Sequence, residues 1–307
     1  MYDIIGDTHG HASRLEALLT KLGYRRKGRV WQHPNRKALF LGDFIDRGPE
    51  QLQTVRIAKD MMEAGHALSV LGNHEFNAVA FVTPDPALPG EFLRPHTPKH
   101  RTQHHRFLEQ VGEGSRQHEE IVAWFRTLPV YLELDGLRAV HACWHPASIQ
   151  ALEPYLTPEA SIRDDAWQAM TSPGSAAHEA VETLLKGVQA PLPAGHSFQD
   201  KDGRTRYAVR SRWWDRTART YADLGRLTED RRHELPVVPV DADIMPGYDG
   251  LKPVFFGHYW MSGTPAPITS TVACLDYSVV LPPPDGKLCA YRWEGESVLR
   301  QAHFAWV

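Results

Sequence analysis

Residues 2–11 read YDIIGDTHGH, and residues 37–49 read KALFLGDFIDRGP. In each stretch a short apolar run ends in a polar motif, and a helical pattern of apolar residues follows it. A third apolar run, Ala67–Leu71, ends in Gly72-Asn73-His74-Glu75. This alternation of strand, loop and helix predicts an α/β fold with parallel strands and crossover helices. Since such sheets bind ligands beyond the carboxyl ends of their strands, the polar motifs are expected to meet there.

The later part of the chain adds strands and two less regular segments. A hairpin with an Asp135-Gly136 turn is predicted over Tyr131–Val140, and Pro253–Phe256 predicts another strand. The tail alternates like antiparallel strands over Thr271–Val280, Lys287–Trp293 and Ser297–Ala305. We interpret 1–307 as one domain with insertions at about 83–128 and 148–239. Pro84–His105 is rich in Pro and His without a clear period, which indicates a loop or cap.

Composition excludes several classes of protein. The net charge of -3 over 307 residues gives no nucleic-acid or membrane footprint. Three separated cysteines, Cys143, Cys274 and Cys289, form no disulfide framework and no CxxC zinc motif, and none begins the Cys-x5-Arg loop of cysteine phosphatases. We expect them to be reduced and mostly buried. No leader or membrane-spanning run is visible, so a cytoplasmic location is expected.

Six residues of metal-ligand type each follow an apolar strand. Carboxylate, imidazole and amide groups suit borderline divalent ions, and two ions about 3.5–4 Å apart need a shared ligand. Asp7 and His9 are two residues apart and can address one ion, and Asp43 is the candidate bridge. The sequence therefore predicts a dimetal site with the ligands Asp7, His9, Asp43, Asn73, His141 and His258.

Three further residues complete the predicted site. His74 adjoins the ligand Asn73, which places it to protonate a leaving oxygen as the catalytic acid. Asp46 can accept a hydrogen bond from the imidazole and orient it. The Arg47 guanidinium offers a fork that matches two phosphoryl oxygens, so it is the predicted substrate clamp.

These motifs resemble the signatures of the phosphoprotein phosphatase family within the calcineurin-like metallophosphoesterases. The resemblance rests on residues 6–10 (GDTHG), 42–48 (GDFIDRG) and 72–75 (GNHE), with Val140-His141 and Gly257-His258 as the later histidine motifs. It implies a β-sandwich flanked by helices, with the dimetal site at the strand ends.

The resemblance also implies residue roles. Asp7, His9 and Asp43 would hold one ion. Asp43 would share the second ion with the remaining ligands, Asn73, His141 and His258. The family uses one more arginine from the C-terminal half. Within Tyr207–Trp214, Arg212 and then Arg210 are the candidates, because residues two apart share one face of a strand.

The resemblance implies hydrolysis without a phosphoenzyme, by in-line attack of a metal-bridging hydroxide. Two divalent ions are expected, with manganese preferred over iron, zinc, cobalt or nickel. Asp46-Arg47-Gly48 and Glu75 follow the protein-phosphatase form, whereas the tail after His258 is more similar to bacterial diadenosine tetraphosphatases and bacterial phosphoprotein phosphatases. The main hypothesis is a phosphomonoesterase of the protein Ser/Thr phosphatase type. The alternative is a bis(5'-nucleosyl)-tetraphosphatase, and a metal-binding scaffold or a nuclease fits less well.

Several residues have ordinary structural interpretations. The cluster His96, His100, His104 and His105 lacks carboxylates, so a solvated insertion is favoured over a second metal site. Trp213 and Trp214 would suit stacking on a nucleobase, but packing in the core is favoured. Arg231-Arg232-His233 is interpreted as a solvated surface.

Overall fold

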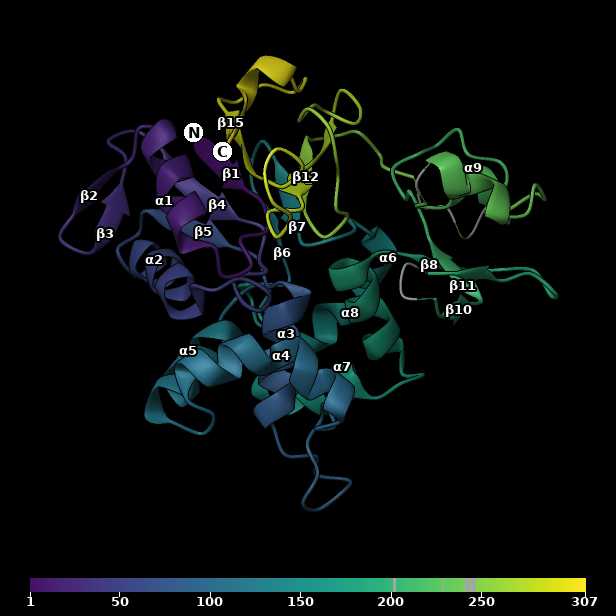
Figure 1. The fold of residues 1–307 in the computed structure, drawn as a ribbon, viewed down its shortest axis with the longest axis horizontal. Coiled ribbons are helices and arrows are strands. Elements are labelled where there is room, and N and C mark those ends of the chain that lie inside the picture. The colour runs from purple at the N-terminus through teal and green to yellow at the C-terminus, as the bar shows by residue number, and fades with distance from the viewer. Residues whose placement is uncertain (201–202, 228, 241–243, 245–246) are drawn as a thin grey trace.

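The computed structural model describes residues 1–200, 203–227, 229–240, 244 and 247–307. Within these residues two β-sheets form the centre of the molecule (Figure 1). The predicted insertion at 148–239 includes residues 201–202 and 228, which lie outside the described part. Among the described residues, no helix combines the length and the apolar character that crossing a bilayer requires.

The first sheet contains the strands that precede the early motifs. Its order is β14-β15-β1-β4-β5, with β16 pairing with β15. β1, β4 and β5 are parallel, as predicted, and β15 is antiparallel to β1. The strands are β1 (Tyr2–Ile5), β4 (Lys37–Phe40), β5 (Ala67–Ser69), β14 (Asp276–Tyr277), β15 (Lys287–Trp293) and β16 (Phe304–Trp306).

The second sheet contains the strands that precede the two late histidine motifs. Its order is β13-β12-β7-β6, and the predicted hairpin forms its antiparallel β6–β7 pair. β12 is parallel to both neighbours. The strands are β6 (Tyr131–Glu133), β7 (Arg138–Val140), β12 (Val254–Phe256) and β13 (Val272–Cys274).

Side chains that alternate in direction along the strands pack the two sheets into a sandwich. Ile4 and Leu39 of the first sheet pack with Ala139 and Phe255 of the second in one buried cluster. The next residue along β1, Ile5, belongs instead to the core beneath the helices. Because successive side chains of a strand point to opposite faces, each strand of the first sheet contributes to both layers. The predicted α/β sandwich flanked by helices is thereby confirmed.

Helices cover the outer faces and one end of the sandwich (Figure 1). α1 and α2 lie against the first sheet, while α3 to α8 gather below the two sheets in the view of Figure 1. The helices are α1 (Ala12–Lys21), α2 (Gln51–Glu63), α3 (Asn73–Val82), α4 (Pro98–Val111), α5 (Arg116–Arg126), α6 (Pro146–Leu152), α7 (Trp167–Thr171), α8 (Ala176–Lys186) and α9 (Tyr221–Leu224).

The segment 84–105 is more ordered than predicted. The expected loop gives way at Pro98 to the four-turn helix α4. The Thr97 side chain accepts a hydrogen bond from His100 N, and Pro98 occupies the first helical turn, so the helix has a well-formed start.

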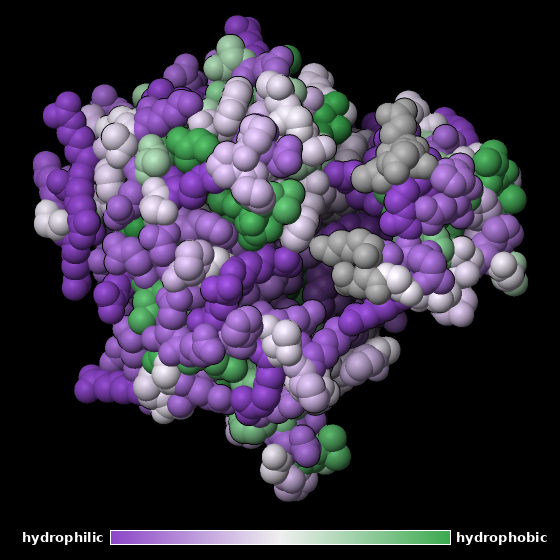
Figure 2. Space-filling view, viewed as in Figure 1, coloured by the Kyte–Doolittle hydropathy of each residue, from purple (hydrophilic) through white to green (hydrophobic). Residues whose placement is uncertain are grey.

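Short antiparallel strand pairs lie outside the two central sheets. β8 pairs with β11, and β9 with β10, in a lobe that projects to the right in Figure 1 together with α9. β2 and β3 form a further hairpin. The strands are β2 (Arg25–Lys27), β3 (Val30–Gln32), β8 (Gln189–Pro191), β9 (Phe198–Gln199), β10 (Thr205–Arg206) and β11 (Ala208–Arg210). The face seen in Figure 2 is mainly hydrophilic. The three cysteines are free and buried, as expected.

Candidate dimetal active site

The carboxyl ends of strands from both sheets converge on one site. Asp7 comes two residues after β1, Asp43 three after β4, and Asn73 begins α3 just beyond β5. From the second sheet, His141 directly follows β7 and His258 comes two residues after β12. Strand order therefore brings together side chains that are up to 251 positions apart in the chain.

Two groups of ligand atoms share Asp43. His9, Asp43 and His74 form one group, and Asp43, His141 and His258 form the other, with all ligand atoms of a group within 4.8 Å of one another. Asp43 Oδ2 lies 3.5 Å from both His9 Nε2 and His141 Nε2. This is the position expected of a bridging carboxylate.

The tautomers of two histidines suit metal binding. His9 Nδ1 donates to the Ile45 carbonyl at 3.0 Å, and His141 Nδ1 donates to the Leu41 carbonyl at 2.6 Å. Because a carbonyl only accepts, each Nδ1 carries a proton, and Nε2, which faces Asp43, is the nitrogen that would bind a metal after losing any proton it carries.

The remaining predicted ligands also lie at this site. Asp7 Oδ2 accepts a hydrogen bond from His258 N at 3.0 Å, and Asn73 Oδ1 lies 3.0 Å from His141 Nε2. Asp7 Oδ1 and His258 Nε2 are buried, and neither makes a hydrogen bond within the described residues. Buried polar atoms without partners are costly, so these two atoms call for a ligand. The donor set fits two divalent ions.

Burial and mutual charge set the pKa values in the cluster. Burial, followed by the charges of Asp276 and Asp43, raises the pKa of Asp7 well above its usual value. Burial opposes the charged form of His141, but the carboxylates of Asp43 and Asp7 outweigh this and raise its pKa to about 10. Burial lowers the pKa of His9 to about 3. A buried acidic centre of this kind is stabilised by added positive charge, which bound cations supply.

The motif backbones are strained. His9, Asp43, Asp46, Arg47 and His258 have φ values of 42°, 53°, 67°, 68° and 67°. Non-glycine residues in this left-handed region cost on the order of 1–3 kcal/mol each and persist where surrounding contacts hold them. Gly42 has φ +85°, and a Cβ there would lie 2.4 Å from Gly72 N, so the two motif loops can touch only with a glycine at this position.

His74 and Asp46 form a close pair. His74 Nδ1 lies 2.5 Å from Asp46 Oδ2, and the ring of His74 remains partly accessible. Burial disfavours the imidazolium, but the carboxylates of Asp43 and Asp46 outweigh it and raise the pKa of His74. His74 Nε2 lies 3.9 Å from Asp43 Oδ2, so the free ring nitrogen faces the metal-ligand cluster.

Arg47 is exposed at the edge of the site. Its guanidinium carbon lies 4.6 Å from the centre of the Trp260 ring, which holds the head group against an aromatic surface. The sequence did not single out Trp260, although it follows His258 by only two residues.

The two candidate arginines differ in position and in their contacts. β11 ends at Arg210, so Arg212 lies beyond the strand and the expectation of a shared face is wrong. Arg210 lies over the Tyr259 ring, and its charge contributes, after burial, to the lowered pKa of His258. Arg212 instead pairs with Asp215 at 3.3 Å. The geometry therefore favours Arg210, reversing the predicted order.

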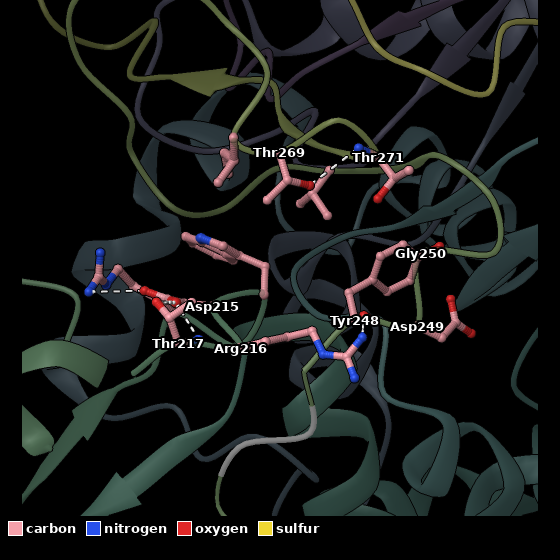
Figure 3. Close-up of a pocket in the computed structure, with 12 residues that line it drawn as sticks. Asp215, Arg216, Thr217, Tyr248, Asp249, Gly250, Thr269 and Thr271 are labelled. Atoms are coloured by element: carbon pink, nitrogen blue, oxygen red, sulfur yellow. Dashed lines mark hydrogen bonds and ion pairs between the residues drawn. The ribbon is translucent and has the colours of Figure 1, made fainter. Parts of the chain in front are cut away.

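Arg212 lines a separate hollow of about 520 Å³ at the amino ends of β12 and β13 (Figure 3). Asp215, Arg216 and Tyr248 form one wall of it, and Thr269 and Thr271 face them. β12 delivers His258 from its opposite end, so the hollow is not part of the metal site.

Two buried acids support the site and were not assigned roles from the sequence. Glu75 accepts hydrogen bonds from the backbone N–H groups of Asp43 and Phe44, both at 2.8 Å, and from Gly72 at 3.2 Å. Asp276 accepts from Trp260 N at 2.8 Å. Glu75 ends the Gly72-Asn73-His74-Glu75 motif, whereas Asp276 begins β14, and no spacing rule distinguishes such a buried acid from an exposed one.

The aromatic and histidine alternatives are resolved by burial. Trp213 is fully buried and donates to the Ala142 carbonyl, and Trp214 packs on Phe256 and Tyr259, so both are core residues. His105 is exposed and His100 is half-buried, which fits the expected solvated insertion. Two members of the cluster differ from this expectation. His96 is half-buried and stacks between Phe81 and Phe92. His104 is buried and lies 2.8 Å from Asp46.

Comparison with known proteins agrees with this geometry. The calcineurin-like phosphoesterase family profile matches residues 2–206, so the chain belongs to that family. An asymmetrical bis(5'-nucleosyl)-tetraphosphatase, PrpE of Oceanobacillus iheyensis, is 31% identical over 141 residues, which are 46% of this chain and 54% of the relative. A symmetrical bis(5'-nucleosyl)-tetraphosphatase of Aromatoleum aromaticum is 31% identical over 139 residues, which are 45% and 42% of the two chains. The match thus spans about half the length of these relatives.

Solved structures share the fold. A cold-active protein tyrosine phosphatase superposes with a TM-score of 0.51 at 16% identity, covering 94% of this chain and 73% of the other. At this identity the likeness establishes the architecture alone.

Proposed function

We propose that the protein is a dimetal-dependent hydrolase of phosphoric esters and anhydrides, acting as a bis(5'-nucleosyl)-tetraphosphatase. The observation that carries the reaction class is the pair of ligand groups that share Asp43. The substrate proposal rests on the names of the relatives, which favour the dinucleoside polyphosphate alternative over the phosphomonoesterase hypothesis. The Trp260 ring beside Arg47 supports it, because nucleobases stack on such surfaces.

We assign Asp7, His9 and Asp43 to one ion. Asp43 also serves the second ion, with Asn73, His141 and His258. Two bound divalent ions would neutralise phosphoryl charge and acidify a water molecule for attack. Manganese is the proposed metal, in a cytoplasmic protein whose residues 1–307 form one domain carrying the two insertions.

The protein's own residues orient the substrate and supply a proton. Arg47, with Arg210 from the other side of the site, binds the non-bridging phosphoryl oxygens. His74 Nδ1 donates to Asp46, so the imidazolium carries its second proton on Nε2. As the bond from phosphorus to the leaving oxygen breaks, that proton moves to the leaving oxygen and His74 becomes neutral.

The His74–Asp46 pair favours a second candidate, the phosphomonoesterase of protein Ser/Thr phosphatase type. An alkoxide leaving group needs a proton in the transition state, whereas a nucleotide phosphate is a good leaving group without one. A close acid pair at 2.5 Å is therefore of most use on alkyl phosphate esters.

A substrate panel on metal-loaded enzyme tests both candidates. Diadenosine tetraphosphate, a phosphoserine peptide and p-nitrophenyl phosphate are compared by kcat/KM, with products separated by chromatography. The tetraphosphatase proposal predicts the highest kcat/KM for diadenosine tetraphosphate, and preference for the phosphopeptide would overturn it. Chromatography also distinguishes asymmetrical cleavage, giving AMP and ATP, from symmetrical cleavage, giving two ADP.

A further inference from the structure

The Asp46 carboxylate is held between two histidines. Its Oδ2 atom lies 2.5 Å from His74 Nδ1, and its Oδ1 atom lies 2.8 Å from His104 Nδ1. All three residues are buried or nearly so, with Asp46 3% and His104 5% exposed. Because a carboxylate only accepts hydrogen bonds, both imidazoles donate to it through Nδ1.

His104 is fixed by the core of the insertion. Its ring centre lies 5.4 Å from that of Phe81 on α3 and 5.0 Å from that of Phe107 on α4. These rings leave the imidazole little freedom to rotate. His104 Nε2 makes no hydrogen bond within the described residues, so the bond to Asp46 is the polar contact that orients the ring.

The helix that carries His104 is tied to the Asp46 loop at a second point. Gln51 Oε1 accepts a hydrogen bond from Asp46 N at 2.6 Å. Gln51 N in turn donates to Gln110 Oε1 of α4 at 2.8 Å, and Gln110 Nε2 donates to the Pro49 carbonyl at 2.6 Å. Hydrogen bonds thus connect Asp46 to α4 twice, from its side chain to His104 and from its backbone through Gln51 to Gln110.

We propose that His104 is a positioning residue for proton transfer, holding the Asp46 carboxylate in the one rotamer that orients His74. On this basis the insertion at 83–128 supplies a residue that positions the proton donor of the site. The inference rests on the proposed role of His74 as proton donor. It predicts that loss of the His104 donor affects leaving groups that need a proton and spares those that do not.

The test compares His104→Leu, which removes the donor, with His104→Asn, whose amide N–H can replace Nδ1–H. His105→Asn, on the exposed face of the same helix, is the matched control. With alkyl phosphates, His104→Leu is expected to lower kcat on the order of ten-fold, a share of the 10²–10⁴-fold typical of general acids. We expect p-nitrophenyl phosphate turnover, KM and metal content to stay within about two-fold, and His104→Asn to recover most of the loss. Equal losses on both substrates, or no recovery, would overturn the proposal.

A double variant separates this proposal from the role of His74. If His104 acts through His74, His104→Leu has no further effect on kcat in a His74→Asn background; a full further loss would contradict positioning. Proton NMR of the deshielded imidazole N–H resonances gives a readout independent of activity. His104→Leu should remove one resonance and shift that of His74, while His104→Asn should restore the latter. An unshifted His74 resonance would overturn the positioning role, whereas a shifted resonance without any phosphatase activity would leave it standing and refute the proposed function.

Discussion

Glu75 shows how one buried side chain supports two motif loops. Its carboxylate accepts three backbone N–H groups, and burial, then the Asp43 charge, raises its pKa to about 7. Glu75→Gln turns one acceptor into a donor that faces backbone N–H groups. We expect metal affinity to fall about 10–100-fold, as for other groups that orient ligands. Metal titration of the purified variant measures this, with the exposed Glu63→Gln as control; unchanged affinity would contradict the assignment.

Gly257 is required by close approach rather than by its backbone angle. A Cβ at this position would lie 2.0 Å from Asp7 Oδ1. Gly257→Ala is therefore expected to displace the Asp7 carboxylate and lower kcat by about 10²-fold, the usual effect of a misplacement near 1 Å. The variant should match Asp7→Ala in metal content while remaining folded by circular dichroism. Full metal content with normal turnover would rule out this steric role.

Some residues of the site could be located from the sequence, and others could not. Asp7, Asp43 and His141 follow strands, so their meeting at one edge was predictable from strand order. His104 was not, because α4 buries positions 104, 107, 108 and 111, and a histidine at the first of them hides the apolar period. The Thr97-Pro98 helix start was the available signal. The left-handed φ values depend on contacts between loops and leave no trace in spacing.

At the scale of elements, β1 carries an acid inside the sheet. Asp3 is fully buried, and Arg36 Nε donates to both of its oxygens at 2.9–3.0 Å. Arg36 Nη2 also donates to the Trp293 carbonyl of β15 at 3.1 Å, so this residue, just before β4, links β1 to β15. Arg36→Met would leave a buried charge without its principal partner.

Breaking a buried pair from one side costs about 3–5 kcal/mol, so Arg36→Met should lower the free energy of unfolding by that amount. Urea denaturation measures the change. The exposed Arg29, which pairs with the half-buried Asp60, is the control, since Arg29→Met should change stability by about 1 kcal/mol or less. Similar effects for the two variants would show that Asp3 is not held by Arg36.

The position at which β11 ends could not be predicted from the sequence, and it decides how Arg210 and Arg212 are placed. A strand across Tyr207–Trp214 would place Arg210 and Arg212 on one face. The strand instead stops at Arg210, and Ser211 N bonds to the Val188 carbonyl. Single-residue boundaries depend on such tertiary hydrogen bonds, which local patterns do not contain.

For the whole molecule, we expect metal binding and stability to be coupled. The proposed ligands follow strands of both sheets, so bound ions would join the two halves of the sandwich. We expect two ions per chain by elemental analysis. Chelation should abolish turnover and lower stability, by about 2.7 kcal/mol per ion relative to metal at one hundred times its Kd. Thermal unfolding with and without chelator checks this, and Asp43→Asn should be insensitive to added metal; an equal metal response in that variant would exclude the shared ligand.

The distance in sequence between Asp7 and His258 has a consequence for synthesis. While the ribosome is still translating the lobe, the nascent chain can present Asp7, His9, Asp43, Asn73 and His141, but one ion group lacks its last histidine. β1 also lacks its antiparallel neighbour until residues 287–293 have emerged. With the proposed ligand set, we therefore expect the complete dimetal site to form only after His258 and β15 have been synthesised.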